Sequence, residues 1–275
     1  MILQRSCFSA VLLVAAPSLA LAQPTTVTYS MAIAGLPIGS ATMVMTPSVN
    51  STSVSLSGKA GGPLEIGKMS ALAVIAPDQV TVQSQSGSGK SAASASLLSS
   101  GAPGSSSFTY TGQNNRGTGK IAMKLAGGRT TALDVSIPDN PTAVRVPVTE
   151  VHKIGVIDPL SLLAQFIKPG GTMNPKGLCG KSHGVFTGQA RLNLSGSEAK
   201  FENTSSLPEG WRAISCSVTL TPVSGHRIDK NRNAGKPQTA SLVFAESIDR
   251  SRTLLWSLSV PGSFGSFSLT ARSVN

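Results

Sequence analysis

The sequence predicts an all-β protein built mainly from antiparallel strands. Alternating apolar and polar residues recur along most of the chain, as in TVTYSMAIAG and GKIAMKLAGG. Only 13% of the residues are charged and 4% are aromatic, and the 28 glycines and 17 prolines often fall between the alternating runs. A single stretch has a clear helical pattern. Small side chains in alternating order are typical of strands and not of a helical bundle.

The N-terminus has the pattern of an export signal. An apolar core follows Arg5 and ends in Ala20-Leu21-Ala22, which matches the small-x-small site of a signal peptidase and predicts cleavage before Gln23. The apolar run is shorter than the ~20 residues that a membrane-spanning helix needs. We therefore expect a signal peptide over 1–22 and a single soluble, β-rich periplasmic domain over 23–275.

The alternating runs define the expected strands in chain order. A first hairpin should turn near Gly35–Gly39, and Gly127-Gly128 predicts a later hairpin turn. Leu64, Met69, Leu72 and Ala73 fit one side of a short helix, although a strand fits the second half of that stretch almost as well. Further strands are expected in TSVSLSGKA, QVTVQSQ, SSFTYTG, RTTALDVSIP, TAVRVPVTEVHKIG, HGVFTGQARLNLSG, EAKFEN, WRAISCSVTLTPVSG, QTASLVFAES, TLLWSLSVP and GSFSLTARSV.

The one convincing helix is DPLSLLAQFIKPGG. Asp158 is placed to cap it, Pro159 suits its first position, and Lys168-Pro169-Gly170-Gly171 ends it. A solitary apolar helix among strands most simply plugs or caps the β-structure. Its apolar residues are either plain core, which we favour, or the lining of a ligand cavity. The residues concerned are Leu160, Leu163 and Ile167, with Phe166 beside them.

Two cysteines remain after the signal. Cys179 and Cys216 would close a loop with 36 residues between them, and in an oxidising compartment we expect a disulfide. A zinc site that adds His183 and His226 is disfavoured, because no closely spaced ligand pair occurs. A Cys179–His183 nucleophile pair is disfavoured as well, because it needs a free thiol.

The segment Gly87-Ser-Gly-Lys-Ser91 superficially matches a phosphate-binding P-loop. The motif needs a glycine where Ser84 stands, and it must open a helix, whereas a Ser- and Gly-rich run follows. We predict a weak strand or a mobile loop here, and no nucleotide.

Other catalytic patterns are incomplete. Ser197 and Lys200 match Ser-x-x-Lys, but the companion motifs of penicillin-recognising enzymes are missing. His152, His183 and His226 lack metal-ligand spacing, and the twelve acidic residues form no obvious catalytic pair. We predict no catalytic residue, metal or cofactor.

The formal net charge is +11 and becomes +10 once Arg5 is removed with the signal. Such a charge marks either an ordinary solvated basic surface or a preference for anionic neighbours, such as phospholipid headgroups, lipopolysaccharide or cell-wall polymers. Nucleic acid is not expected, because the compartment lacks it and no basic strand studded with aromatic residues occurs.

Four stretches follow one another in an order that is also seen in a known protein family: YSMAIAGLPIGSATM, RVPVTEVHKIGVIDPLSLLAQF, LCGKSHGVFTGQARLNLS and CSVTLTPVSGHR. From Tyr29 to the C-terminus the chain resembles the exported bacterial family known as domain of unknown function 3108. Family members usually have Phe-Asp-Gly followed by basic residues. This chain has Phe186-Thr187-Gly188 followed by Arg191 alone.

The resemblance implies a strongly curved, incompletely closed β-barrel or β-spiral with one or two short helices packed inside it or capping it. Proteins of that shape are linked to cell-envelope integrity, and carriers of lipoproteins have a comparable open barrel. We therefore expect a non-enzymatic periplasmic protein that supports the envelope by binding a lipid, a lipoprotein or a protein partner. The alternative is a hydrolase or binding protein that acts on cell-wall or surface polysaccharide.

Overall fold

The computed structural model describes most of the chain after the N-terminal segment. The described residues are 23–48, 50–60, 67–76, 78–88, 91–114, 117–137, 144–168, 172–202, 207–228, 235–262 and 265–275. The expected signal peptide, residues 1–22, lies outside them.

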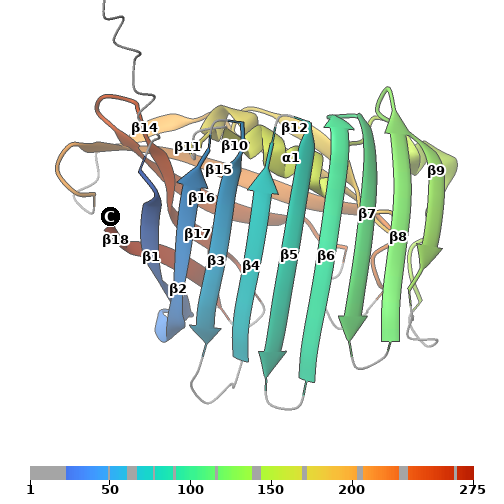
Figure 1. Ribbon diagram of the computed structural model, residues 1–275, viewed down its shortest axis with the longest axis horizontal. Helices are drawn as coiled ribbons and strands as arrows, with labels where there is room; N and C mark the ends of the chain where they lie inside the picture. The colour runs from blue at the N-terminus through green and yellow to red at the C-terminus, as the bar shows by residue number, and fades with distance from the viewer. Residues whose placement is uncertain are drawn as a thin grey trace, which may run out of the picture.

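The fold is one large antiparallel sheet of sixteen strands, which confirms the all-β class (Figure 1). The order across the sheet is β12-β13-β15-β16-β17-β18-β1-β2-β3-β4-β5-β6-β7-β8-β9, and β14 pairs with β15 beside that path. The strands of the first half are β1 (Thr25–Ile33), β2 (Leu36–Pro47), β3 (Thr52–Ala60), β4 (Gly67–Ile75), β5 (Gln79–Ser88), β6 (Ser91–Ala102), β7 (Ser105–Asn114), β8 (Gly117–Ala126) and β9 (Arg129–Ser136). Those of the second half are β12 (Ser182–Phe186), β13 (Arg191–Gly196), β14 (Lys200–Glu202), β15 (Trp211–Ser224), β16 (Gln238–Ser247), β17 (Thr253–Val260) and β18 (Phe267–Val274).

The connection between the two halves contains short helices and a small second sheet. These elements are η1 (Glu150–Lys153), α1 (Pro159–Phe166), η2 (Pro175–Gly177) and the two-stranded pair β10 (Ile167–Lys168) and β11 (Thr172–Met173). No helix among the described residues has the length and apolar character that crossing a lipid bilayer requires.

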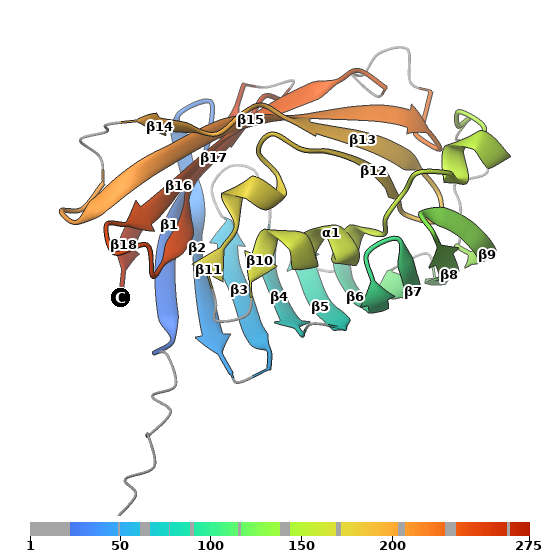
Figure 2. The same ribbon diagram turned by 90° about the horizontal axis from the view of Figure 1, so that it is seen from above.

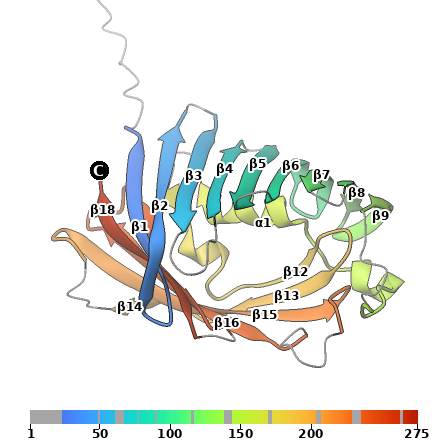
Figure 3. The ribbon, with the colours of Figure 1, turned by 90° about the horizontal axis from the view of Figure 1, so that it is seen from below.

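The sheet curves so that its two halves face each other (Figures 2 and 3). Strands β2–β9 form a front wall, and β12, β13 and β15–β18 form a back wall, with β1 joining the two. Helix α1 lies between the walls. The end strands β9 and β12 do not pair with each other, so the sheet is not closed by hydrogen bonds. The curved, incompletely closed architecture is therefore confirmed.

Alternation along each strand builds the core. In β8 the side chains of Ile121, Met123 and Leu125 are buried, while Ala122 and Lys124 between them are exposed. One apolar cluster joins the inner faces of both walls to the helix. Within it, the rings of Phe166 and Phe244 meet edge to face with their centroids 5.7 Å apart.

Two sequence predictions were wrong in detail. Residues 67–75 form strand β4, so the short helix was wrong and the strand alternative for the second half of that stretch was right; Leu64 lies outside the described residues. Pairing with β3 and β5 places Ala73 in the core and leaves Leu72 exposed, so the apolar spacing was not that of a helix. In the run TAVRVPVTEVHKIG, predicted to be a strand, the described residues contain isolated bridges at Arg145 and Ile154 with η1 between them.

The Ser/Gly-rich segment forms a hairpin of β5 and β6, so the weak-strand alternative was right. After the P-loop-like match the chain continues as strand β6, and not as the helix that a P-loop requires. The turn itself, Gly89-Lys90, lies outside the described residues.

Candidate binding site at the seam of the sheet

The helix starts at a buried carboxylate, as predicted. Asp158 is fully buried, and its Oδ1 accepts hydrogen bonds from the backbone N–H groups of Leu160 and Ser161 at 3.0 and 2.9 Å. Its Oδ2 accepts from the hydroxyls of Ser161, Ser106 and Ser99. Ser99 lies in β6 and Ser106 in β7, so one side chain both caps the helix and ties it to the front wall. We call Asp158, Ser99, Ser106 and Ser161 the Asp158 cluster.

The predicted apolar face of the helix is core. Leu160 and Ile167 are buried in the apolar core. Leu163 and Phe166 pack against that core and are partly exposed. Pro159 occupies the first helical position as expected, but α1 ends at Phe166 and Ile167 already belongs to β10. A pocket of 130 Å³ opens beside the helix, and the helix residues that line it are Ser161, Ala164 and Gln165. The four residues proposed as a cavity lining do not line this pocket.

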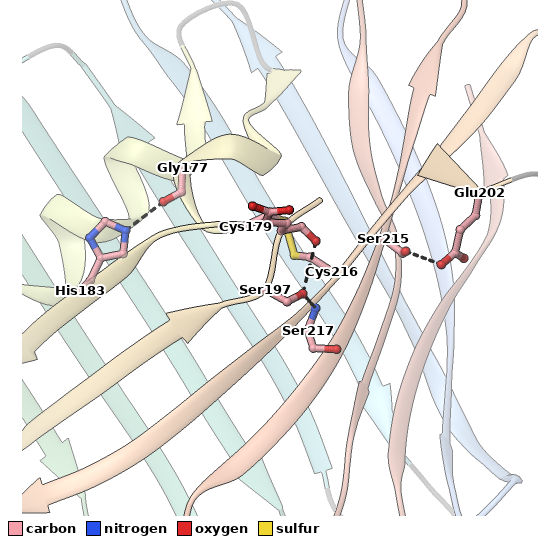
Figure 4. Close-up of a disulfide and its surroundings, with 9 residues drawn as sticks. Gly177, Cys179, His183, Ser197, Glu202, Ser215, Cys216 and Ser217 are labelled. Carbon is pink, nitrogen blue, oxygen red and sulfur yellow. Dashed lines mark hydrogen bonds between the residues drawn. A yellow bond between two sulfur atoms is a disulfide. The ribbon is translucent and has the colours of Figure 1, made fainter. Parts of the chain in front are cut away.

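The two cysteines form the predicted disulfide (Figure 4). Cys179 and Cys216, whose Cα atoms are 5.8 Å apart, are both buried, and the bond ties the turn after η2 to β15. His183 points away from this bond: its Nε2 lies 3.0 Å from the carbonyl oxygen of Gly177. Ser197, the hydroxyl of the Ser-x-x-Lys match, accepts a hydrogen bond from the Ser217 N–H and lies between strands.

The remaining histidines are apart. Nδ1 of His152 accepts the backbone N–H of Thr149 in the cap of η1. His226 follows β15, where its carbonyl accepts the N–H of Val146. Among the described residues, no three His, Cys, Asp or Glu side chains converge in a way that would hold a metal ion.

We call the gap between the two walls the seam. A short segment of the chain bridges it. Ile154–Ile157 runs across it: Val156 donates to Gly128 O beside the front wall, and Ile157 donates to Gly184 O of β12, both at 2.8 Å. Phe186 returns a hydrogen bond of 3.0 Å to the carbonyl of Ile157.

Arg191 fixes this segment from the back wall. Its Nη1 donates to the carbonyl oxygen of Ile154 at 2.6 Å and to that of His152 at 3.3 Å, so the guanidinium caps the end of η1. The adjoining turn also touches the front wall, because a Cβ at Gly188 would lie 2.4 Å from Cγ2 of Ile121. Two of the four stretches that carry the family resemblance, 145–166 and 178–195, thus meet at the seam.

The seam contains a pocket of 350 Å³. Backbone forms much of its wall: a Cβ at Gly184 would lie 2.5 Å from the Gly155 carbonyl oxygen, so a glycine is needed for this approach. The hydroxyls of Ser105 and Ser182 and the imidazole of His183 supply polar groups. The lining residues are Pro103, Gly104, Ser105, Gly127, Gly128, Gly155, Val156, Ile157, Ser182, His183 and Gly184.

Exposed apolar side chains occur on β9 and on the bridging side of the seam. Leu133 and Val135 of β9 and Val151 and Ile154 on the bridging side are all exposed. Glu150 is held by Lys153 through a hydrogen bond of 2.7 Å, which with the charge of that ammonium lowers the pKa of Glu150. Single exposed apolar residues are ordinary, but a group of them at an open sheet edge is typical of an interaction surface.

Sequence reasoning missed most of this site. His183 was considered only as a metal or nucleophile partner, and Arg191 only as a departure from the family pattern. Ser99 and Ser106 lie in a serine-rich run, and the sequence does not distinguish these two buried serines from the exposed ones around them. The glycines were the available signal, since five of them line one pocket.

No family model matches the chain, and searches of the curated proteins and of the solved structures found no significant match.

Proposed function

We propose that this chain is a non-enzymatic, exported protein of the bacterial envelope that acts by binding a protein partner at the seam. The family resemblance and the N-terminal export pattern support the location. The disulfide fits an oxidising compartment such as the periplasm.

One observation carries the choice of a protein partner over a lipid. The space between the walls contains side chains: a single apolar cluster runs from the inner face of the front wall through the helix to the back wall. Phe166 and Phe244, one from the helix and one from the back wall, are in direct contact there. A lipid chain would have to displace this packing, which has the cost of opening a core.

The buried carboxylate beside the seam fits a structural role better than catalysis. Both oxygens of Asp158 are occupied by hydrogen bonds in a fully buried position. Glu246 is paired with Arg212, and Glu150 with Lys153. A catalytic carboxylate must reach a substrate proton, and the fully buried, hydrogen-bonded Asp158 is not placed to do so.

Native mass spectrometry of the protein exported into a bacterial periplasm tests the proposal. We expect the mass of the chain after cleavage before Gln23, lower by the two hydrogens lost in the disulfide, with no bound small molecule. An added mass in the lipid range that is lost on denaturation would contradict the proposal and favour a lipid carrier.

A further inference from the structure

Strand β9 is an edge strand with one open side. It pairs with β8 from Lys120 to Ala126. On its other side, Arg129 alone meets a neighbour, Ile154 of the bridging segment, and from Thr130 to Ser136 no described residue pairs with it. Figures 1 and 2 show β9 at the end of the front wall. An unpaired row of N–H and C=O groups is a template for another strand.

The inner face of β9 is only partly covered: a Cβ at Gly188, in the turn after β12, would lie 3.5 Å from Cδ1 of Leu133. Leu133 and Val135 lie opposite Met123 and Ile121, which are only 2% and 7% exposed. Leu133 and Val135 themselves are 36% and 38% exposed. The same face of the sheet thus changes from buried to open within one strand, so a further strand with apolar inner side chains would complete it.

The charges around this edge are mostly positive. Among the described residues, Asp134 on the strand and Glu150 of η1 carry acidic side chains, and Lys153 already holds Glu150. Asp134 faces outward in the middle of the strand, opposite Ala122, where it would repel an acidic neighbour. The basic side chains on or beside the edge are Lys120, Lys124, Arg129, Lys153 and Arg191.

We propose that β9 binds an extended acidic segment of the partner protein as an added antiparallel strand. The alternate apolar residues of the bound segment lie beside Leu133 and Val135. The acidic residues of the segment lie at its C-terminal end, beside Arg129. Every strand pairing in the large sheet is antiparallel, which sets this direction. The inference rests on the proposed binding function and names the chemistry of the partner.

A second copy of the chain fits this edge less well. The formal net charge, +11 for the full chain and +10 once Arg5 is removed with the signal, makes two copies repel each other, and the basic side chains at the edge would face basic side chains of the second copy.

Two labelled peptides test the proposal on the full protein without its signal. Both are acetylated and alternate threonine with valine; one ends in two glutamates and the other in two lysines. By fluorescence anisotropy at low salt, we expect the glutamate peptide to bind at least about tenfold more tightly and to weaken as salt is added. Equal binding of the two peptides, or no binding of the glutamate peptide, overturns the proposal.

Matched variants locate the binding. Leu133→Lys and Val135→Lys should each weaken the glutamate peptide by about tenfold or more. Leu72→Lys, at a similarly exposed leucine on the outer face of β4, should leave it unchanged. An equal loss in Leu72→Lys overturns the assignment to β9, and melting curves confirm that each variant is folded. Sedimentation that shows a dimer, abolished by Leu133→Lys, would give the edge to a second copy and also overturn it.

The two proposals can fail separately. A lipid mass in the native spectrum defeats the proposed function whatever the peptides do. A bare mass together with failure of the glutamate peptide leaves partner binding in place and moves it to another surface.

Discussion

The Asp158 cluster and the seam are neighbours in the fold, but the groups of the first are buried and hydrogen-bonded, whereas the second has groups that are open to solvent. Val156 and Ile157 line the seam pocket, and Asp158 follows them directly in the chain. At Asp158, five donors satisfy two carboxylate oxygens in a fully buried position. At the seam, apolar side chains and a strand edge face solvent. The first arrangement stabilises the fold, and the second leaves surface for a partner.

The largest expected effect is at Asp158. Asp158→Ala leaves three buried hydroxyls without their acceptor and removes the helix cap, so we expect a loss of about 4 kcal/mol in the free energy of unfolding. Urea denaturation measures it. Asp158→Asn keeps one acceptor oxygen and should lose about half as much, while Asp134→Ala on exposed β9 should stay within about 0.5 kcal/mol of the wild type. A loss below about 1 kcal/mol in Asp158→Ala would show that the cluster does not anchor the helix.

The disulfide should come next. The loop between Cys179 and Cys216, 37 positions apart, implies about 4 kcal/mol on the chain-entropy model as an upper limit, and we expect about 3 kcal/mol. The double variant Cys179→Ala/Cys216→Ala should lose this stability in urea. Under strong reductant the wild type should fall to the level of the variant, and a difference that persists there would point to altered packing instead.

Gly188 tests the contact between the two walls near the seam. Its φ is +88°, and a Cβ would lie 2.4 Å from Ile121, so Gly188→Ala should destabilise the protein by about 2 kcal/mol. Gly127→Ala is the matched control: its φ is +56°, but no atom lies within 4 Å of the added Cβ. We expect about 1 kcal/mol there. Equal thermal shifts in the two variants would mean that the turn does not press on the front wall.

Tyr29 gives the smallest effect at neutral pH. Its hydroxyl donates to the carbonyl of Leu255 at 2.9 Å, and Tyr29→Phe should cost about 1 kcal/mol. Burial raises the pKa of Tyr29 above its ordinary 10.0, so the neutral phenol stabilises the fold below that pH, and this stability is lost as the pH rises above it. At a pH one unit above that value the wild type should have lost about 1.4 kcal/mol more than the variant. Parallel losses in urea curves across this pH range would contradict the assignment.

The strands were predictable because alternation is a local signal. In β8 the buried positions hold Gly, Ile, Met and Leu and the outward ones Thr, Lys and Ala, so the alternation can be read from the sequence alone. Asp158, Pro159 and the disulfide were predictable for the same reason, since capping and cysteine pairing depend on few residues. Leu72 and Met69 misled because apolar spacing over four positions fits a helix or a strand, and only the pairing with β3 and β5 decides.

The seam could not be predicted, because it is made by contacts between distant segments. Gly128, Gly155 and Gly184 meet there from three parts of the chain. Ser106 and Ser99 differ from the exposed serines around them only through their position opposite Asp158. A periodic pattern shows which face is buried but not which distant residue covers it.

Hydrogen–deuterium exchange read by mass spectrometry tests the contrast between a sealed interior and an open seam most directly. Amide groups of β7, which has a paired strand on each side, should exchange only with global unfolding. The amide groups of β9 from Thr130 to Ser136 that point away from β8 should exchange orders of magnitude faster, because no described residue pairs with them. Protection of β9 equal to that of β7 in the isolated protein would contradict the account, since it would show that the edge is already covered.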